Sequence, residues 1–162
     1  MTHYEDMPQD SKVWIYQSNR EFRDSEVDAI RKRMKEFMED WAAHGQQLNA
    51  FGDVYYNRFV VIVVNEIEVQ ASGCSIDKSV HLIKEICETF TVDLFDRLSV
   101  TYMKGLDVFA CDKATFLQKV TSGEIDDKTL VFNNLVNTKV LFETEWKVPF
   151  KDHFLSKNIS VI

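Results

Sequence analysis

The sequence predicts an α+β fold, because strand-like and helix-like patterns follow one another along its 162 residues. Runs of β-branched and aromatic residues mark the strands, whereas apolar residues spaced three and four apart mark the helices. A hydrophobic content of 45% suffices for one sizeable core, or for one domain with a small appended domain. We therefore expect a globular chain, neither fibrous nor disordered.

The first two elements are a strand and a helix. The run Val13 to Tyr16 is rich in β-branched and aromatic residues and predicts the strand. Ser25 is a candidate N-cap of the helix, with Asp28 in place of a capping-box glutamate. The predicted helix has one apolar face, formed by residues spaced three and four apart: Val27, Ile30, Met34, Phe37, Met38 and Trp41. We expect the helix to end at Gly45. As a cation, His44 beside it would interact favourably with the negative end of the helix dipole.

The middle of the chain predicts a hairpin and a second helix. Leu48 to Phe51 and Val54 to Asn65 flank Gly52-Asp53, a dipeptide typical of a hairpin turn. Within the second of these segments, the unbroken apolar run Phe59 to Val64 predicts a central strand buried on both faces. The second helix is expected from about Asp77 to Thr89. Its inward residues are predicted to be Ile76, Val80, Ile83, Cys87 and Phe90, and its solvated residues Lys78, His81, Glu85 and Glu88.

The last third of the chain predicts a smaller set of elements. Two strands, Leu98 to Met103 and Val108 to Cys111, are joined by a turn at Lys104-Gly105. Asp112 is suited to cap a short helix, which Gly123 ends. A last strand is expected at Thr129 to Phe132.

These elements define an expected architecture. Through Met103 their order is βαββαβ, which is typical of ferredoxin-like folds, and a small strand-turn-strand-helix-strand portion follows. We expect a flexible leader over residues 1–11, an α+β portion over 12–103 and a small α+β portion over 104–162, packed as one compact unit. The irregular tail from Asn133 is expected to wrap the core or meet a partner, because it carries Trp146, Phe150 and Phe154.

Composition indicates which classes of partner and which cellular compartment to expect. The net charge of −7, from 26 acidic and 19 basic side chains, disfavours nucleic acid and anionic membranes. Three cysteines without a CxxC pair, Cys74, Cys87 and Cys111, predict reduced thiols and no zinc site. The sequence shows neither a signal peptide nor an apolar run near the roughly 20 residues that span a bilayer. We therefore expect a cytoplasmic protein without metal or other cofactor.

The segment Ser72 to Ser79 is the strongest candidate site in the sequence, because it brings a thiol, hydroxyls and a carboxylate to a helix start. Free N–H groups and the helix dipole favour anions and thiolates there. Cys74 is the candidate nucleophile, with His81, His44 or His153 as its base. The candidate ligands of a small anion or polar molecule are Ser75, Asp77 and Lys78. The alternative is a capped helix start without further role.

Three other patterns have simpler interpretations. Ser75 and Lys78 fit the SxxK pattern of penicillin-binding enzymes, but the companion SDN and KTG motifs are missing. Asp77, His81 and Glu85 share a helix face, yet a metal site there lacks a second histidine. Asn133 and Asn134 belong to an amide cluster that either binds a polar ligand or ties down a loop.

Several segments along the chain carry a resemblance to a known family. They are VWIYQSNREF (Val13 to Phe22), YNRF (Tyr56 to Phe59), SGCSIDKSVH (Ser72 to His81), DLFDR (Asp93 to Arg97) and VFNNLVNTK (Val131 to Lys139). Through them the chain resembles a family of small uncharacterised bacterial proteins that are often labelled ABC transporter ATPases. Such an ATPase needs a GxxxxGK phosphate loop, which this sequence lacks. The resemblance therefore implies no ATPase activity and supplies no known reaction.

A second resemblance covers roughly Thr101 to Pro149. The segments YMKGLDV, SGEIDDKTLVF and WKVP are similar to GYF-like modules. The peptide-binding members of that group use a Gly-Pro-Phe or Gly-Pro-Tyr element, which is missing here. The resemblance implies a strand, helix and strand arrangement and says little about a ligand.

Together, these patterns favour a binding or interaction protein over an enzyme, because no catalytic constellation is complete. The expected partner is a second copy of the chain, forming a homodimer, or another protein. The alternative is a thiol-dependent enzyme that uses Cys74.

Overall fold

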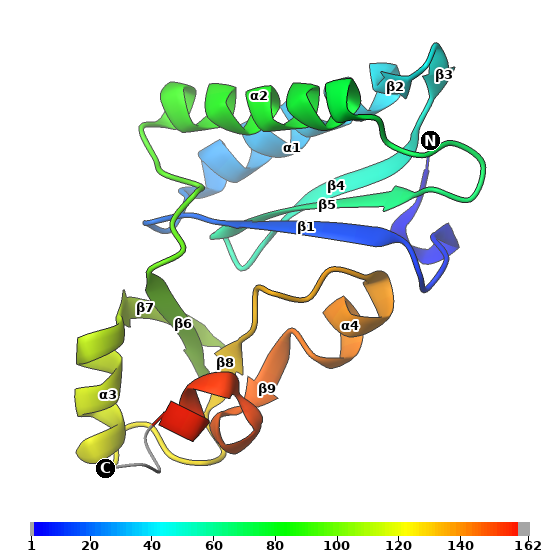
Figure 1. The fold of residues 1–162 in the computed structure, drawn as a ribbon. Helices are drawn as coiled ribbons and strands as arrows, with labels where there is room; N and C mark the ends of the chain where they lie inside the picture. Colours follow the sequence, from blue (N-terminus) through cyan, green and yellow to red (C-terminus); the bar gives the residue numbers. More distant parts are fainter. Residues whose placement is uncertain (1, 159–162) are drawn as a thin grey trace. The chain divides into compact units, whose positions relative to one another are not determined.

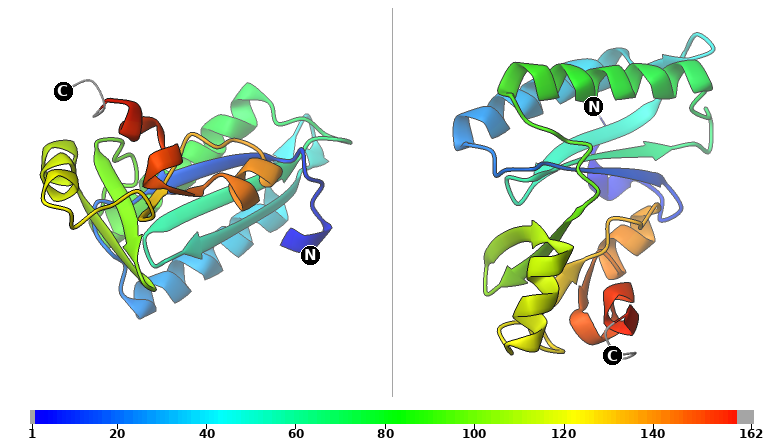
Figure 2. Two further views of the ribbon diagram at one scale, coloured as in Figure 1. Left: turned by 90° about the horizontal axis from the view of Figure 1, so that it is seen from below. Right: turned by 60° about the vertical axis from the view of Figure 1, so that its left-hand side comes forward.

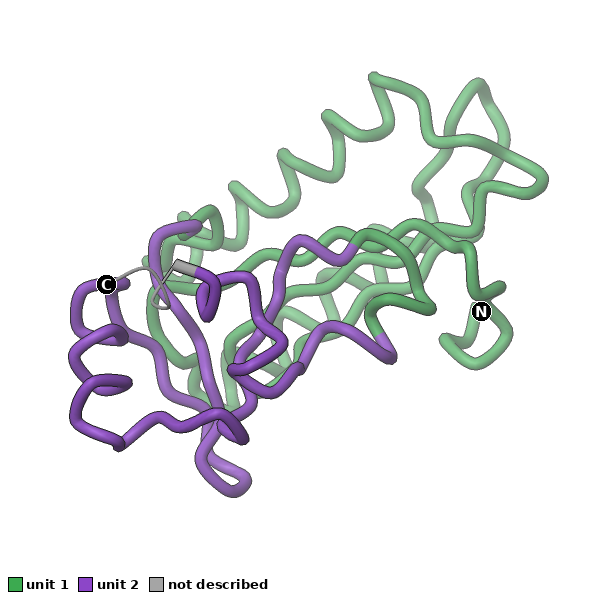
Figure 3. Tube along the Cα trace, turned by 60° about the horizontal axis from the view of Figure 1, so that its bottom comes forward, with its two compact units in different colours: residues 1–96, 137–142 green, residues 97–136, 143–162 purple. Residues whose placement is uncertain are grey.

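The computed structural model describes residues 2–158, in which four α-helices and three antiparallel sheets form an α+β fold (Figure 1). The chain divides into two compact units (Figure 3). Unit 1 comprises residues 1–96 and 137–142, and unit 2 comprises residues 97–136 and 143–162. The α+β class is confirmed. The division follows residue 96, whereas the sequence placed the boundary after residue 103.

The main sheet of unit 1 has three antiparallel strands, β1 (Lys12–Gln17), β5 (Phe59–Asn65) and β4 (Asn49–Tyr55), in that spatial order. The prediction of a central, fully buried strand is confirmed, since Phe59 to Val64 of β5 are completely inaccessible to solvent. Hydrophobic burial on both faces explains the unbroken apolar run.

The predicted turn at Gly52 and Asp53 is wrong, because both residues lie within β4. The chain instead reverses at Tyr56 and Asn57, whose φ angles of 53° and 51° are left-handed. Gly52 has a packing role: a Cβ added there would overlap the Cε atom of Met34. The glycine therefore marks a close approach between strand and helix.

Helices α1 (Asp24–Asp40) and α2 (Gly73–Phe90) cover one face of this sheet (Figure 2). The predicted inward residues Val27, Ile30, Met34 and Met38 of α1 are buried. They pack in one core with apolar side chains of β4, β5 and α2. Burial of this stripe, more than helix propensity, stabilises α1.

The start of α1 differs from the prediction. Ser25 and Asp28 do not cap it, because the helix begins at Asp24 and the Glu26 carboxylate accepts the Arg23 N–H at 2.9 Å. Arg20 holds the same carboxylate through two hydrogen bonds of 2.9 and 2.8 Å. This charge-assisted pairing fixes the first turn.

The end of α1 is also earlier than predicted. The helix ends at Asp40, and a small hairpin of β2 (Ala42–Ala43) and β3 (Gln46–Gln47) follows. His44 and Gly45 form its turn with φ angles of 52° and 77°. Gly45 is therefore a turn residue and not the helix end.

Helix α2 begins earlier than its predicted start at Asp77. Ser72 is the N-cap, and its Oγ accepts the Ser75 N–H at 3.1 Å. The buried residues are Ser75, Ser79, Leu82, Ile83 and Ile86, so of the predicted inward residues only Ile83 is fully buried. The small serines allow this face to approach the core closely. Lys78, His81, Glu85 and Glu88 are exposed, as predicted.

Residues from the second half of the chain close the outer edge of β1. Val13 N–H donates to the carbonyl of Asn137 at 3.0 Å, and Lys139 N–H donates to that of Ser11 at 2.9 Å. This part of the tail wraps a core, as the sequence suggested. The expected leader packs here too, since Met7 is buried and its carbonyl accepts the Lys139 Nζ at 2.8 Å.

Unit 2 contains a four-stranded antiparallel sheet in the order β7-β6-β8-β9. The strands are β6 (Ser99–Lys104), β7 (Asp107–Asp112), β8 (Leu130–Phe132) and β9 (Lys147–Pro149). Because β6 pairs in this sheet, the described main sheet of unit 1 keeps three strands and does not complete the expected ferredoxin-like arrangement.

The helices of unit 2 are short. Asp112 caps α3 (Lys113–Thr121), as predicted, by accepting the Thr115 N–H at 2.7 Å. Helix α4 (Lys139–Thr144) begins in the unit 1 segment and ends in unit 2. Unit 2 also contains the 3₁₀ helices Phe150–Asp152 and Phe154–Asn158, and unit 1 contains a third, Tyr4–Asp6. No helix within residues 2–158 has the length and apolar character needed to cross a membrane.

The aromatic tail contributes to the interior of unit 2. Trp146 and Phe150 are buried, and Phe150 contacts the buried ring of Phe116. Phe154 is 47% exposed. Two of the three predicted interface aromatics therefore cover the protein's own core.

Candidate functional site

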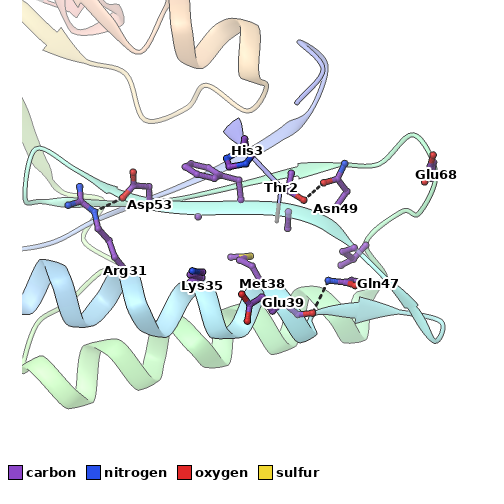
Figure 4. Close-up of a pocket in the computed structure, with 14 residues that line it drawn as sticks. Thr2, His3, Arg31, Lys35, Met38, Glu39, Gln47, Asn49, Asp53 and Glu68 are labelled. Atoms are coloured by element: carbon purple, nitrogen blue, oxygen red, sulfur yellow. Dashed lines mark hydrogen bonds and ion pairs between the residues drawn. The ribbon is translucent and has the colours of Figure 1, made fainter. Parts of the chain in front are cut away.

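A cavity of about 660 Å³ lies in unit 1 along the outer edge of β4 (Figure 4). We call it the edge groove. Helix α1 lines one side with Arg31, Lys35, Met38 and Glu39, and β4 lines the other with residues 49–53. Its remaining lining residues are Thr2, His3, Gln47, Leu48 and Glu68.

The direction of the backbone hydrogen bonds shows which groups of β4 face the groove. In an antiparallel sheet, successive residues of a strand bond alternately to its two sides. The Arg58 carbonyl accepts the Ser18 N–H and therefore faces the β1 side of β5. By the alternation, the backbone N–H and C=O groups of Phe59, Val61 and Val63 of β5 face β4. Their register partners are the odd-numbered residues of β4. The N–H and C=O groups of Ala50, Gly52 and Val54 therefore point outward.

Val54, at one end of this outward row, has partners that confirm its direction. Its N–H donates to the Asp53 Oδ1 at 2.7 Å, and its carbonyl accepts from the Arg31 Nη2 at 3.0 Å. Arg31 and Asp53 also pair with each other at 2.6 Å. Charged side chains that fold around a strand edge in this way block further strand pairing.

The other end of the row is closed by backbone. Leu48 N–H donates to the carbonyl of Trp41 at 2.9 Å. Between the two closed ends, no side chain of the described residues hydrogen-bonds to the backbone of Ala50 or Gly52. The structure thus leaves a short stretch of strand edge open inside a concave groove.

Two methionine side chains of α1, Met34 and Met38, pack against the open stretch of β4 at Gly52. A Cβ on Gly52 would overlap the Met34 Cε and lie 3.0 Å from the Met38 Cε. Met38 also lines the groove. Flexible thioether side chains adapt to different apolar surfaces, so this part of the groove suits contacts of varied shape.

Charge changes sign along the groove, as Figure 4 shows. Arg31 and Lys35 lie toward the Asp53 end, whereas Glu39 and Glu68 lie toward the Gln47 end. Arg31 is neutralised by Asp53. Within residues 2–158, the side chains of Lys35, Glu39 and Glu68 form no ion pair, so both charge signs are available to a ligand.

The predicted site at Ser72 to Ser79 is a well-bonded helix start. The hydroxyl of Ser75 donates to the Ser72 carbonyl at 2.8 Å, and Ser75 is buried. Cys74, Asp77 and Lys78 are exposed on α2. His81 lies about 10 Å beyond Cys74 along the helix axis, given the rise per residue. The structure does not bring that thiol and imidazole into hydrogen-bond contact.

The other two candidate bases, His44 and His153, lie in a hairpin turn and in the interior of unit 2. His44 occupies the exposed hairpin turn. His153 is buried in unit 2, where its Nε2 contacts the Phe132 carbonyl at 3.1 Å and its Nδ1 accepts the Leu155 N–H at 3.2 Å. Desolvation by burial lowers the pKa of His153, although the hydrogen bond to Phe132 opposes this effect.

The amide cluster ties down a loop of unit 2. Asn134 Oδ1 accepts the Trp146 indole N–H at 2.9 Å, and Asn133 Oδ1 accepts the Leu135 N–H at 3.1 Å. Of the two roles that the sequence left open for Asn133 and Asn134, these bonds favour the structural one.

Metal binding finds no geometric support in the part of the chain that is described. Over residues 2–158, no three side chains among His, Cys, Asp and Glu gather closely enough to hold a metal ion. Glu85, one member of the helical set considered from the sequence, instead pairs with Arg33 at 2.6 Å.

Comparisons with protein-family models, with curated proteins and with solved structures each gave no match. The edge groove was not predicted from the sequence. Its one sequence signal is Gly52 inside a strand-like run, since such a glycine often marks a place where another group approaches closely.

Proposed function

We propose that this protein is a non-enzymatic binding protein whose ligand occupies the edge groove. The observation that carries the proposal is the open backbone of Ala50 and Gly52 beside a cavity of about 660 Å³. Cavities of roughly 300–1,000 Å³ with a few convergent polar groups are typical ligand sites. A ligand that pairs with this backbone replaces the water that otherwise satisfies it.

Comparison of the two edges of the main sheet supports this proposal. The chain covers the β1 edge with its own residues 137–140. The β4 edge is closed only at its ends, by the Leu48 N–H and by the Arg31 and Asp53 pair. Because proteins normally protect strand edges, an edge that is restricted to a short open stretch suits selective binding.

The remaining sequence predictions are compatible with a binding role. Neither the resemblance to the small bacterial family nor that to GYF-like modules implies a reaction. Apart from the small β2-β3 hairpin, the elements β1, α1, β4, β5 and α2 of unit 1 follow the order βαββα, which supports a distant relation to ferredoxin-like folds. The free thiols Cys74, Cys87 and Cys111 support a cytoplasmic location. The thiol-enzyme alternative has an exposed Cys74 in its favour, but its candidate base His81 lies about two turns further along α2.

Fragment binding followed by NMR tests the proposal without knowledge of the natural ligand. A set of small amide-containing fragments is titrated into the ¹⁵N-labelled full chain. We expect shift changes to cluster at the amides of Ala50, Gly52 and Lys35. Shifts that cluster at the start of α2 instead, or no shifts at the groove, contradict the proposal.

A pair of tryptophan variants provides the control. Lys35→Trp fills the groove from α1, whereas Lys32→Trp adds the same bulk to an exposed residue of α1 outside the groove lining. We expect Lys35→Trp to abolish the fragment-induced shifts and Lys32→Trp to leave them. Equal effects of the two variants argue against the edge groove as the site.

A further inference from the structure

We propose that the ligand of the edge groove is an extended peptide segment of a partner protein. In this proposal, which rests on the proposed function, the segment pairs antiparallel to β4. It carries an acidic side chain toward its N-terminal end and a basic side chain toward its C-terminal end. Addition of a strand to a sheet edge is a common mode of peptide recognition, in which backbone hydrogen bonds give affinity and side-chain contacts give specificity.

The open stretch sets the length of the paired segment. Ala50 and Gly52 each offer one N–H donor and one C=O acceptor toward the groove, by the alternation described above. Leu48 at one end and Val54 at the other are already bonded. A bound strand therefore pairs over a short central stretch, and its neighbouring side chains contact the two closed ends.

The charge pattern sets the sequence and direction of the segment. Helix α1 runs antiparallel to β4, since Arg31 bonds to Val54 while the Glu39 carbonyl accepts from Gln47. Lys35 thus lies nearer the C-terminal end of β4, and Glu39 nearer its N-terminal end (Figure 4). An antiparallel peptide passes Lys35 before Glu39, and these two residues lie one helical turn, or about 6 Å, apart. The peptide is complementary when it carries an acidic side chain beside Lys35 and a basic one two residues later, on the same face of the strand, beside Glu39.

A second copy of the chain is the competing occupant. Symmetric pairing of two β4 strands through Ala50 and Gly52 places Asp53 of one copy opposite Asn49 of the other. The second copy then presents its Lys35 to Glu39 and Glu68, so the charges within the groove match. Each copy carries a net charge of −7, however, and this overall repulsion opposes the association of two copies. A short foreign segment without a large negative charge avoids the repulsion.

Fluorescence anisotropy with designed peptides tests the proposal. The probe is fluorescein-labelled Thr-Glu-Val-Lys-Thr-Val with an amidated C-terminus, in which Glu and Lys lie on the same face of the strand, and its comparison is Thr-Lys-Val-Glu-Thr-Val of the same composition. We expect the first peptide to bind the full chain about five- to tenfold more tightly, as a few surface charge contacts allow. Methylation of its central amide nitrogens removes the backbone donors and should weaken binding by about tenfold or more.

Charge-swapped variants of α1 give the decisive comparison. Lys35→Glu combined with Glu39→Lys should reverse the preference between the two peptides. Lys32→Glu combined with Glu36→Lys makes the same exchange outside the groove lining and should leave the preference unchanged. All four residues are exposed, so the variants should fold, and circular dichroism checks that they do.

Three outcomes overturn the proposal. The swapped variant keeps the original preference, or the N-methylated peptide binds as tightly as its parent. The third is a concentration-dependent dimer, seen by sedimentation, that Lys35→Glu alone abolishes, because this result identifies a second copy as the occupant. If fragments shift Ala50 and Gly52 but no peptide binds, the peptide proposal fails while the proposed function stands. If neither binds, both fail.

Discussion

The indole N–H of Trp41 donates a hydrogen bond of 2.8 Å to the main-chain carbonyl of Ser75, and both residues are buried. The bond joins the residue after α1 to the first turn of α2. It anchors to the core the segment that the sequence offered as a ligand site. The serine-rich helix start therefore holds two helices together, and the open polar backbone lies at β4 instead.

Replacement of Trp41 by phenylalanine tests this anchor. Trp41→Phe keeps an aromatic ring against Phe37 but removes the donor to Ser75. We expect the free energy of unfolding to fall by about 2–4 kcal/mol, since a buried hydrogen bond is lost and the smaller ring leaves a cavity in the core. Urea denaturation measures the change. Trp14→Phe is the control, because the partly exposed Trp14 forms no such bond, and an equal loss in both variants speaks against the anchor.

The Glu26 carboxylate should make the stability of α1 depend on pH. Its hydrogen bonds from Arg20, and then that from Arg23, lower its pKa to about 2 from 4.5. A carboxylate with a lowered folded-state pKa stabilises the fold above its unfolded pKa. We expect that stabilisation to disappear as the pH falls from about 4.5 toward 2. Glu26→Gln should remove about 1 kcal/mol at pH 7 and flatten this part of the pH profile.

Asp28 provides the matched control for Glu26, since the sequence assigned it the capping role. Asp28 is exposed in the second turn of α1. Asp28→Asn should lower the unfolding free energy by a few tenths of a kcal/mol at most, through the helix dipole alone. Chemical denaturation from pH 7 to pH 3 compares the variants. A larger effect at Asp28 than at Glu26 would restore the sequence-based capping scheme.

Gly52 should tolerate no side chain without loss of stability. Its added Cβ would overlap the thioether end of the fully buried Met34, which has to move. We expect Gly52→Ala to cost about 1–2 kcal/mol in thermal or urea unfolding, as overpacking does. Gly73→Ala meets nothing within 4 Å at the start of α2 and should be neutral or slightly stabilising. Equal costs at both glycines would refute the packing role.

His153 should make unit 2 less stable in mild acid. Desolvation by burial lowers the pKa of His153 below its ordinary 6.5, so the unfolded state binds the proton more readily. The stability contributed by neutral His153 is complete above about pH 6.5 and is lost as the pH falls toward the folded-state pKa. Thermal melts followed by tryptophan fluorescence should show this loss. His153→Gln should flatten the profile below pH 6.5, whereas His81→Gln, on the exposed face of α2, should preserve it.

The cysteines should differ in their rates of alkylation. Cys74 is exposed, while Cys87 and Cys111 are partly buried, and desolvation raises the pKa of both buried thiols. We expect iodoacetamide at pH 8 to modify Cys74 first, with mass spectrometry of the digested chain as the measurement. Faster modification of Cys87 or Cys111 would show that these thiols open to solvent more readily than the structure indicates.

Local patterns in the sequence predicted those elements whose residues decide their own structure. The apolar run of β5, the inward stripe of α1 and the Asp112 cap of α3 were all predicted, because burial period and capping are local signals. Two of the errors have different origins. At the start of α1 the error was local, because the Glu26 carboxylate bonds to the Arg23 N–H and to Arg20, and Ser25 lies inside the helix. At Gly52 a distant group decides, because the glycine lies within β4 where Met34 approaches closely.

The α+β class, the central strand and the exposed face of α2 could be predicted, since each follows from the pattern of apolar and polar residues along one segment. Which strand edge stays open could not be predicted in this way. The alternation of hydrogen bonds along β4 and the closure of β1 by residues 137–140 depend on pairing between segments far apart in the chain. A groove formed by backbone groups and by side chains from α1 leaves no contiguous signal in a sequence.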